Sequence, residues 1–333
     1  MLHDEYKKTH RILEILEMLM QNQPVRKRDL INKFEITDKS IFRYIAELNN
    51  YFSTRYNEDD SIIYDKKIKG YRLKDELRAN LTEQECLSVI KLILDSRAFS
   101  HDDLSRIIGK LMYGLSKDKT ELLKNFYSKE IDEYIPIKNN KSMFKIMWDI
   151  NSAAKEQFVV NIKYHKIIDN TVVDRAIEPL SIMFSEYYFY TLAYDHNRNK
   201  RDNPITFRLD KILEYNITDI KFKKNNAIDK QFHEGEFRKQ MQFMNFGDRI
   251  TVTFEFWGRS VEAVLDRLPT AVIKEKYFDN EKQREVYRLT ATIYGKGVKM
   301  WFLSQAEYLR VTAPKDFVDE MRDTIDKMKN NYN

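Results

Sequence analysis

Two apolar-patterned segments joined by three residues stand near the start of the chain: Lys27–Phe34 (KRDLINKF), Glu35–Thr37 (EIT) and Asp38–Phe52 (DKSIFRYIAELNNYF). In the first and third segments apolar residues recur three and four positions apart, which is the spacing of a helix that buries one face. Three residues leave room only for a tight turn. Thr37 or Asp38 can cap the following helix by offering a side-chain oxygen to its unpaired amides. The pattern therefore predicts two helices joined by a short turn.

The flanking segments extend this pattern. Thr9–Gln21 carries the broad apolar stripe of a helix packed on a core. Ile62–Leu73 (IIYDKKIKGYRL) alternates apolar and polar residues around a lysine-rich centre, which predicts a two-stranded hairpin. Helix, helix, turn, helix and basic hairpin is the order of a winged helix-turn-helix, which places one helix in a DNA major groove and the hairpin, or wing, against the backbone. We therefore expect residues 1–75 to form a DNA-binding domain.

The candidate DNA-binding residues lie on the helix 38–52, on the helix before it and on the hairpin. Ile41, Ile45 and Leu48 form the apolar face of helix 38–52, so its other face can meet base edges and phosphates. Lysines at the hairpin tip would neutralise phosphates without reading sequence. The predicted contacts are Arg28, Lys39, Ser40, Arg43, Tyr44, Lys66, Lys67 and Lys69. The alternative is that these side chains form only a solvated charged face, as most charged helix faces do.

Residues 76–140 have the pattern of a helical connector. Thr82 and Glu85 have the spacing of a capping box, in which each side chain satisfies a backbone amide of the other residue. Helical spacing of apolar residues continues to Tyr134, and these apolar faces would suit dimerisation as well as packing within the domain. Cys86 is expected to be a small buried apolar residue.

Composition excludes several classes of protein. A single Cys rules out an intramolecular disulfide framework and a zinc site with several cysteines. Only 8 Gly, no Gly-rich phosphate loop, no nucleophile motif and scattered His residues argue against an enzyme and against a cofactor or metal. No apolar run reaches the roughly 20 residues of a membrane span, and the N-terminus is no signal peptide, so we expect a cytoplasmic protein. The net charge of +5 fits a polyanionic partner without requiring one.

The apolar pattern changes in the second half of the chain. Lys141–Ile150 is an amphipathic helix, and from Val159 onward apolar residues alternate with a period of two. Further strands are expected at Tyr187–Tyr194 and Pro204–Leu209. Short antiparallel strands at this spacing predict a small, strongly twisted sheet or barrel.

Three motifs in this region resemble the WYL-domain family of transcriptional regulators: RAIEPL at Arg175–Leu180, YFYTLAYDHNR at Tyr188–Arg198 and TFRLDKI at Thr206–Ile212. The Trp-Tyr-Leu triplet that names the family reads Phe-Tyr-Thr here, at residues 189–191. The resemblance implies a small Sm-like β-barrel, the WYL domain, over residues 141–222. It also implies a C-terminal extension over residues 235–333 with a ferredoxin-like β-α-β-β-α-β order. The whole chain would then be a multidomain α+β protein.

The same resemblance implies an effector site on the small barrel. In the family a set of polar and basic residues is thought to bind a nucleotide or nucleic acid, and the matching positions are Tyr164, Tyr190, His196, Arg198 and Arg208. Arginine pairs with phosphate through two parallel N–H groups, and aromatic rings stack on bases. The alternative is a structural role, in which Arg208 pairs with Asp210 at a sheet edge and Tyr190 is a core aromatic.

These patterns and the resemblance together predict a homodimeric, DNA-binding transcriptional regulator. Its two winged helices would bind the half-sites of a pseudo-palindromic operator in duplex DNA. An anionic nucleotide or nucleic-acid effector at the WYL domain would shift the dimer between binding-competent and incompetent states. Two other interpretations stay open: a binding module for single-stranded nucleic acid, and an accessory regulatory subunit whose winged helix is a protein-interaction surface.

Overall fold

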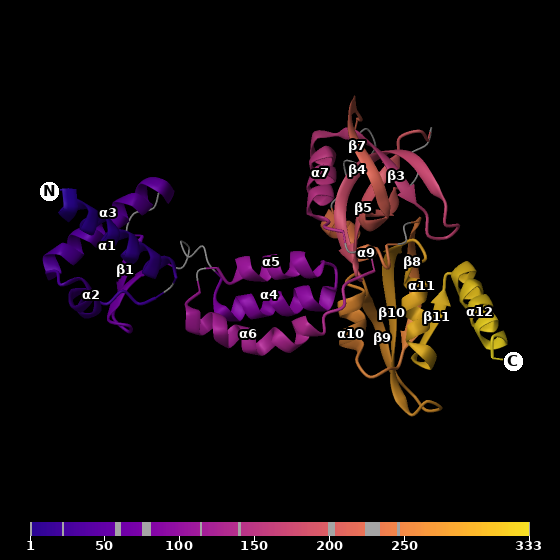
Figure 1. Ribbon diagram of the computed structural model, residues 1–333. Coiled ribbons are helices and arrows are strands. Elements are labelled where there is room, and N and C mark those ends of the chain that lie inside the picture. The colour runs from indigo at the N-terminus through magenta and orange to yellow at the C-terminus, as the bar shows by residue number, and fades with distance from the viewer. Residues whose placement is uncertain are drawn as a thin grey trace. The chain divides into compact units, whose positions relative to one another are not determined.

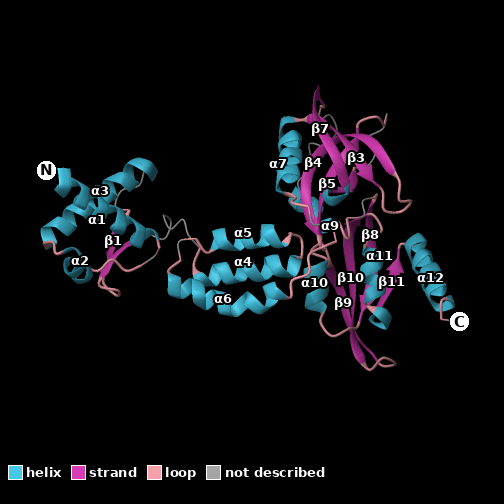
Figure 2. Cartoon of the chain, viewed as in Figure 1, coloured by secondary structure: helices cyan, strands magenta, loops and turns pink. Residues whose placement is uncertain are grey.

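The computed structural model describes residues 2–21, 23–56, 61–74, 81–113, 115–138, 141–198, 204–223, 234–244 and 247–332. The chain divides into two compact units, residues 1–140 and 141–333. Helices and antiparallel strands occur in both units (Figures 1 and 2), so the fold class is α+β, as predicted.

The first unit opens with three helices and a hairpin, namely α1 (Leu2–Met20), α2 (Lys27–Phe34), α3 (Asp38–Tyr56), β1 (Ile62–Asp65) and β2 (Gly70–Leu73). The bounds of α2 and the start of α3 are those predicted, whereas α1 begins before Thr9 and α3 continues beyond Phe52. Helix α2 ends at Glu35, whose left-handed backbone (φ 52°) lets its amide bond to the carbonyl of Ile31. One buried core joins all five elements and includes Ile15, Leu30, Ile41, Phe52, Ile62 and Leu73.

The hairpin is tied to the chain before α2. Strands β1 and β2 pair with Asp65 opposite Gly70, so the tip consists of residues 66–69. Val25 forms an isolated antiparallel bridge with Tyr71, a pairing that the sequence pattern does not predict. A Cβ atom at position 70 would stand 3.1 Å from the carbonyl oxygen of Val25. Glycine at this position therefore allows the close approach of the two backbones.

Three further helices complete the first unit: α4 (Glu83–Ser96), α5 (His101–Leu111) and α6 (Lys117–Asp132). The predicted capping box is present, because the Thr82 hydroxyl accepts from the Glu85 amide and the Glu85 carboxylate accepts from the Thr82 amide. Cys86 is fully buried in the core of these helices, as expected, and its thiol lies 3.1 Å from the carbonyl oxygen of Leu111.

The second unit begins with helix α7 (Phe144–Glu156) and a five-stranded antiparallel sheet. Its strands are β3 (Phe158–His165), β4 (Val172–Ser185), β5 (Tyr188–Asp195), β6 (Ile205–Arg208) and β7 (Ile212–Lys221), in the order β6-β5-β4-β3-β7. Helix α7 packs Ile146, Ile150 and Ala153 against one face of this sheet. The sequence pattern predicts the helix and four of the strands but not β7.

The expected barrel is not closed, so that part of the prediction is wrong. Strands β6 and β7 form the two edges of the sheet and do not pair with each other in the part of the chain that the structure describes. The sheet is nevertheless strongly curled, because only Leu209–Lys211 joins its two edges. A flat five-stranded sheet would hold its edges about 19 Å apart, whereas three residues of 3-10 helix span about 6 Å. Tyr164 of β3 accordingly reaches Phe207 of β6 (ring centroids 5.2 Å apart).

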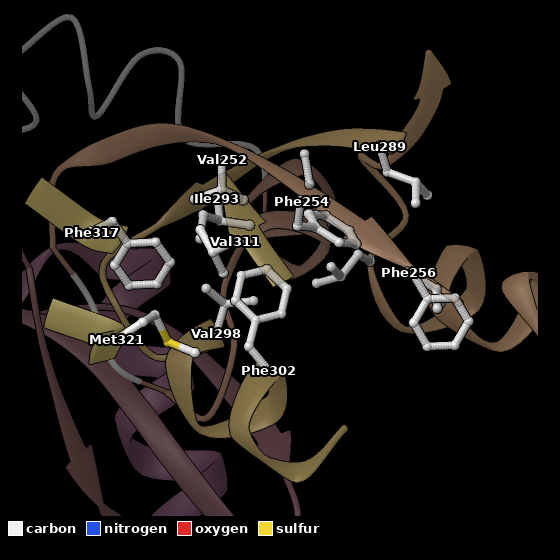
Figure 3. Close-up of a cluster of buried hydrophobic side chains, with 13 residues drawn as sticks. Val252, Phe254, Phe256, Leu289, Ile293, Val298, Phe302, Val311, Phe317 and Met321 are labelled. Carbon is white, nitrogen blue, oxygen red and sulfur yellow. The ribbon is translucent and has the colours of Figure 1, made fainter. Parts of the chain in front are cut away.

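The C-terminal part of the second unit contains β8 (Arg249–Phe256), α10 (Val261–Arg267), β9 (Val272–Asp279), β10 (Arg284–Tyr294), α11 (Val298–Ser304), β11 (Leu309–Ala313) and α12 (Lys315–Asn330). The sheet order is β11-β8-β10-β9, and all pairs are antiparallel. This is the predicted β-α-β-β-α-β order, followed by one more helix. In Figure 3, Phe302, Phe317 and Phe254 converge in its core.

A short helix, α9 (Glu234–Gln240), precedes this part of the chain. Its Phe237 packs with Met183 and Leu192 of the five-stranded sheet, on the face opposite α7, and Tyr294 of β10 packs beside them. The second unit therefore has apolar clusters between α7 and the five-stranded sheet, between its two sheets, and in the core of the C-terminal part.

Candidate functional site

The polar face of α3 is exposed, and its apolar face is part of the core. Lys39 and Arg43 are exposed, and Ser40 is half-buried. Tyr44 is only 2% exposed and belongs to the core, so its predicted position on the polar face is wrong. The reason is helical geometry, because Ile41, Tyr44 and Leu48 lie at the three- and four-residue spacing of one buried stripe.

The wing carries its lysines at the tip. Lys66, Lys67 and Lys69 are exposed in the turn between β1 and β2. Asp65 fixes this turn, because its carboxylate accepts the backbone amide of Lys67 (2.8 Å) and the Nε–H of Arg72 (3.0 Å). These hydrogen bonds hold the pKa of Asp65 below its usual value. The carboxylate that organises the turn is therefore ionised at neutral pH.

The predicted DNA-binding cations form one set by their environment. Arg28, near the start of α2, is exposed like the others. The six cations are Arg28, Lys39, Arg43, Lys66, Lys67 and Lys69. None of them forms an ion pair within the described residues. A face of unpaired cations is suited to a polyanion, which supplies the counter-charge.

Phe42 and Lys27 lie beside the predicted contacts but are not among them. The Phe42 side chain is 51% exposed, although it lies between Ile41 and Arg43 on α3. The ammonium of Lys27, the first residue of α2, stands 3.7 Å from the centre of the Phe42 ring and 5.9 Å from that of Tyr71. Position 42 adjoins the apolar stripe, and its exposure is visible only in the folded helix.

Five residues around β6 form a compact cluster in the five-stranded sheet. The guanidinium of Arg208 donates two parallel hydrogen bonds to Asp210 (2.9 and 2.7 Å) and lies over the ring of Tyr188 (3.3 Å to its centre). Tyr190 stands opposite Arg208 in the register of β5 and β6. The backbone amide of Arg208 donates to the hydroxyl of Tyr164 (3.4 Å). The structural alternative for Arg208, a pair with Asp210, is therefore present.

Burial dominates the electrostatics of this cluster. It raises the pKa of the Tyr164 and Tyr190 hydroxyls above the usual value, and Arg208 opposes this only in part. Burial also acts to lower the pKa of Arg208, but the hydrogen bonds and charge of Asp210 outweigh it and leave that pKa raised. At neutral pH the Tyr164 and Tyr190 hydroxyls are therefore protonated and Arg208 is charged. Tyr188 and Asp210 belong to the cluster although they were not among the predicted residues.

His196 and Arg198 lie at the other end of β5. The Nδ1 atom of His196 is 2.7 Å from Oε1 of Glu178, a carboxylate that is almost fully buried. Arg198 is exposed, and its Nε atom is 3.8 Å from Oδ2 of Asp195, which Arg175 approaches at the same distance. Tyr190 and His196 are six positions apart along an extended strand, which is about 20 Å. The five predicted effector residues therefore fall into two groups, and no single small ligand spans both.

Two other kinds of site are not evident. Among the described residues no three His, Cys, Asp or Glu side chains are arranged to hold a metal ion. Of the helices that can be described, none combines the length and the apolar character needed to cross a membrane.

Comparison with known families identifies the five-stranded sheet. Residues 145–217, from α7 through most of β7, match the model of the WYL domain. The chain therefore carries a WYL domain over these residues, which confirms the resemblance of its three motifs. A search of curated proteins found no match.

Two solved structures are similar to this chain. One is the proteasome accessory factor B/C (PafBC) of Arthrobacter aurescens, with 15% identity and a TM-score of 0.32 over 96% of this chain and 47% of the other. The other is a CRISPR Cas-related protein, with 15% identity and a TM-score of 0.37 over 89% of this chain and 74% of the other. The chain thus spans about half the length of PafBC.

Proposed function

We propose that this WYL-domain protein is a DNA-binding transcriptional regulator whose first 75 residues form a winged helix-turn-helix. The observation that carries the proposal is the face of unpaired cations on α2, on the first turns of α3 and on the wing tip. In this fold class the first turns of the recognition helix, which is α3 here, enter the major groove and the wing lies on the phosphates. Arg43 and Lys39 would contact base edges and phosphates, and Lys66, Lys67 and Lys69 would neutralise phosphates.

The active form in this proposal is a homodimer on a pseudo-palindromic operator. A two-fold protein axis is mirrored in the two half-sites of such an operator. Helices α4 and α6 leave Leu92, Leu122 and Phe126 more than half exposed, which supports a contact between two copies of this chain.

The WYL domain would sense an anionic nucleotide or nucleic-acid effector in the cytoplasm. Two groups on the sheet provide cations and aromatic rings for such a ligand: Arg208 with Tyr188 and Tyr190, and His196 with Arg198. Because these groups are about 20 Å apart, a strand of several nucleotides fits them better than a mononucleotide does. The effector would shift the dimer between two states of different operator affinity.

The test is binding of the purified full-length chain to duplex and single-stranded DNA over a salt series. We expect duplex binding with a sequence preference and a steep fall in affinity as salt increases, because phosphate contacts release counterions. Tight binding to single strands alone would instead move the main site to the WYL domain. Absence of salt-dependent binding to any DNA would refute the proposal and favour an accessory subunit that uses residues 1–75 to bind protein.

A further inference from the structure

Phe42 is an exposed aromatic ring inside the cationic face of α3. It is the fifth residue of the helix and follows Lys39 by three positions, so both side chains lie on neighbouring parts of the helix surface. Its side chain is 51% exposed, although the preceding residue, Ile41, is fully buried. A large apolar side chain therefore stands half exposed beside the cations Lys39 and Arg43 of the same helix.

Lys27 holds this ring in place. Its ammonium stands 3.7 Å from the ring centre, directly over one face, and 5.9 Å from the ring of Tyr71 on the wing strand β2. A cation over an aromatic face is an attractive contact that restricts the ring. Lys27 therefore covers one face of Phe42 and links the start of α2, helix α3 and the wing. The remaining surface of the ring stays open to a ligand.

We propose that Phe42 reads the 5-methyl group of a thymine in each operator half-site, with Lys27 as its positioning residue. The inference rests on the proposed function, because it assigns a base contact to the proposed DNA-binding face. A phenyl ring offers no hydrogen bond to base edges or phosphates. The thymine methyl is the one apolar group that a base pair displays in the major groove, and Phe is among the residues that contact it. Residues in the first turns of the helix are those that enter this groove.

The experiment replaces thymine by uracil, which lacks only that methyl group. A preferred duplex is first obtained with the wild-type chain by selection from randomised duplexes. Each thymine of a half-site is then replaced in turn by deoxyuridine, and the affinity is measured. We expect one position at which uracil weakens wild-type binding about fourfold per half-site, the equivalent of one buried methyl group.

Variants connect this penalty to the ring. Phe42→Ala is expected to bind the thymine and uracil duplexes equally, and Phe42→Leu, which keeps an apolar side chain, is expected to retain a reduced penalty. Lys27→Gln is expected to lower the penalty because the ring loses its covering cation. Phe278→Ala is the matched control, since Phe278 is 57% exposed on β9 of the second unit, outside the proposed DNA-binding domain. It is expected to keep the full penalty.

The outcomes separate this inference from the proposed function. Salt-dependent, sequence-preferring duplex binding that is indifferent to uracil at every position overturns the role of Phe42 and leaves the regulator intact. An unchanged uracil penalty in Phe42→Ala overturns it equally, and an unchanged penalty in Lys27→Gln removes the role of Lys27. Failure to bind any duplex overturns both proposals.

Discussion

The cationic side chains of the two candidate sites have opposite environments. On α2, α3 and the wing, cations such as Arg43 are exposed and form no ion pair within the described residues. In the WYL domain each predicted basic residue faces a carboxylate: Arg208 faces Asp210, Arg198 faces Asp195 and His196 faces Glu178. The same kinds of residue are therefore available to a polyanion in one region and lie beside internal carboxylates in the other.

This difference separates two uses of positive charge. Unpaired exposed cations add attraction that a phosphate backbone can use at once. A paired cation must first give up or share its partner, which makes ligand binding dependent on local rearrangement. We infer that the first region provides affinity for a polyanion, whereas the second is suited to a ligand that competes with internal carboxylates. Four variants test this contrast.

The largest effect is expected for Arg43→Ala. A base-reading arginine contributes about 1–3 kcal/mol, so duplex affinity should fall about 10- to 100-fold while the thermal unfolding midpoint stays unchanged. Lys124→Ala is the control, because it removes an exposed charge from α6. Equal duplex affinity of the Arg43→Ala variant and the wild type would refute α3 as the recognition helix.

Asp210→Asn tests whether the WYL charges are held as pairs. The Arg208 side chain is only 19% exposed, so the loss of its carboxylate should destabilise the protein by about 2 kcal/mol. Chemical denaturation monitored by fluorescence measures this, with the exposed Asp219→Asn as a matched control. If Asp210→Asn unfolds at the wild-type denaturant concentration, the pair is not structural and the contrast between the regions weakens.

The three wing lysines should act on salt dependence more than on sequence preference. Replacing Lys66, Lys67 and Lys69 together by Gln removes up to three phosphate contacts, each of which contributes about 0.9 to the slope of log affinity against log salt. We expect the magnitude of this slope to decrease by about 3. The affinity should decrease by the same factor for duplexes of different sequence. A changed sequence preference with an unchanged slope would mean that the wing reads bases.

The smallest effect on stability is expected for Arg198→Ala. Its side chain is 67% exposed and 3.8 Å from Asp195, so the pair contributes less than about 0.5 kcal/mol. The same variant should lose the response of operator binding to an anionic effector while basal binding survives. A clear loss of stability, or an intact response in both Arg198→Ala and Arg208→Ala, would remove these residues from the effector site.

Local patterns in the sequence predicted much of the fold. The bounds of α2 and the capping box at Thr82 follow from short-range spacing, and the β-α-β-β-α-β order is what the resemblance implies. The errors concern long-range structure. The pattern does not predict strand β7, because its apolar and polar residues alternate only weakly. The resemblance implies a closed barrel, whereas pairing of the two edge strands depends on curvature that no local pattern encodes. Tyr44 has a hydroxyl like its polar neighbours and is therefore predicted on the polar face of α3, but it is buried with the apolar face.

The candidate sites show the same division. The sequence by itself determined the class of side chain at each position, including the lysines of the wing and the WYL motifs around Arg208, because residue type and spacing are local properties. Only the tertiary structure decided which of them are paired and that Lys27 covers the ring of Phe42. Contacts between distant segments depend on how helices and strands pack, and packing is a property of the whole fold.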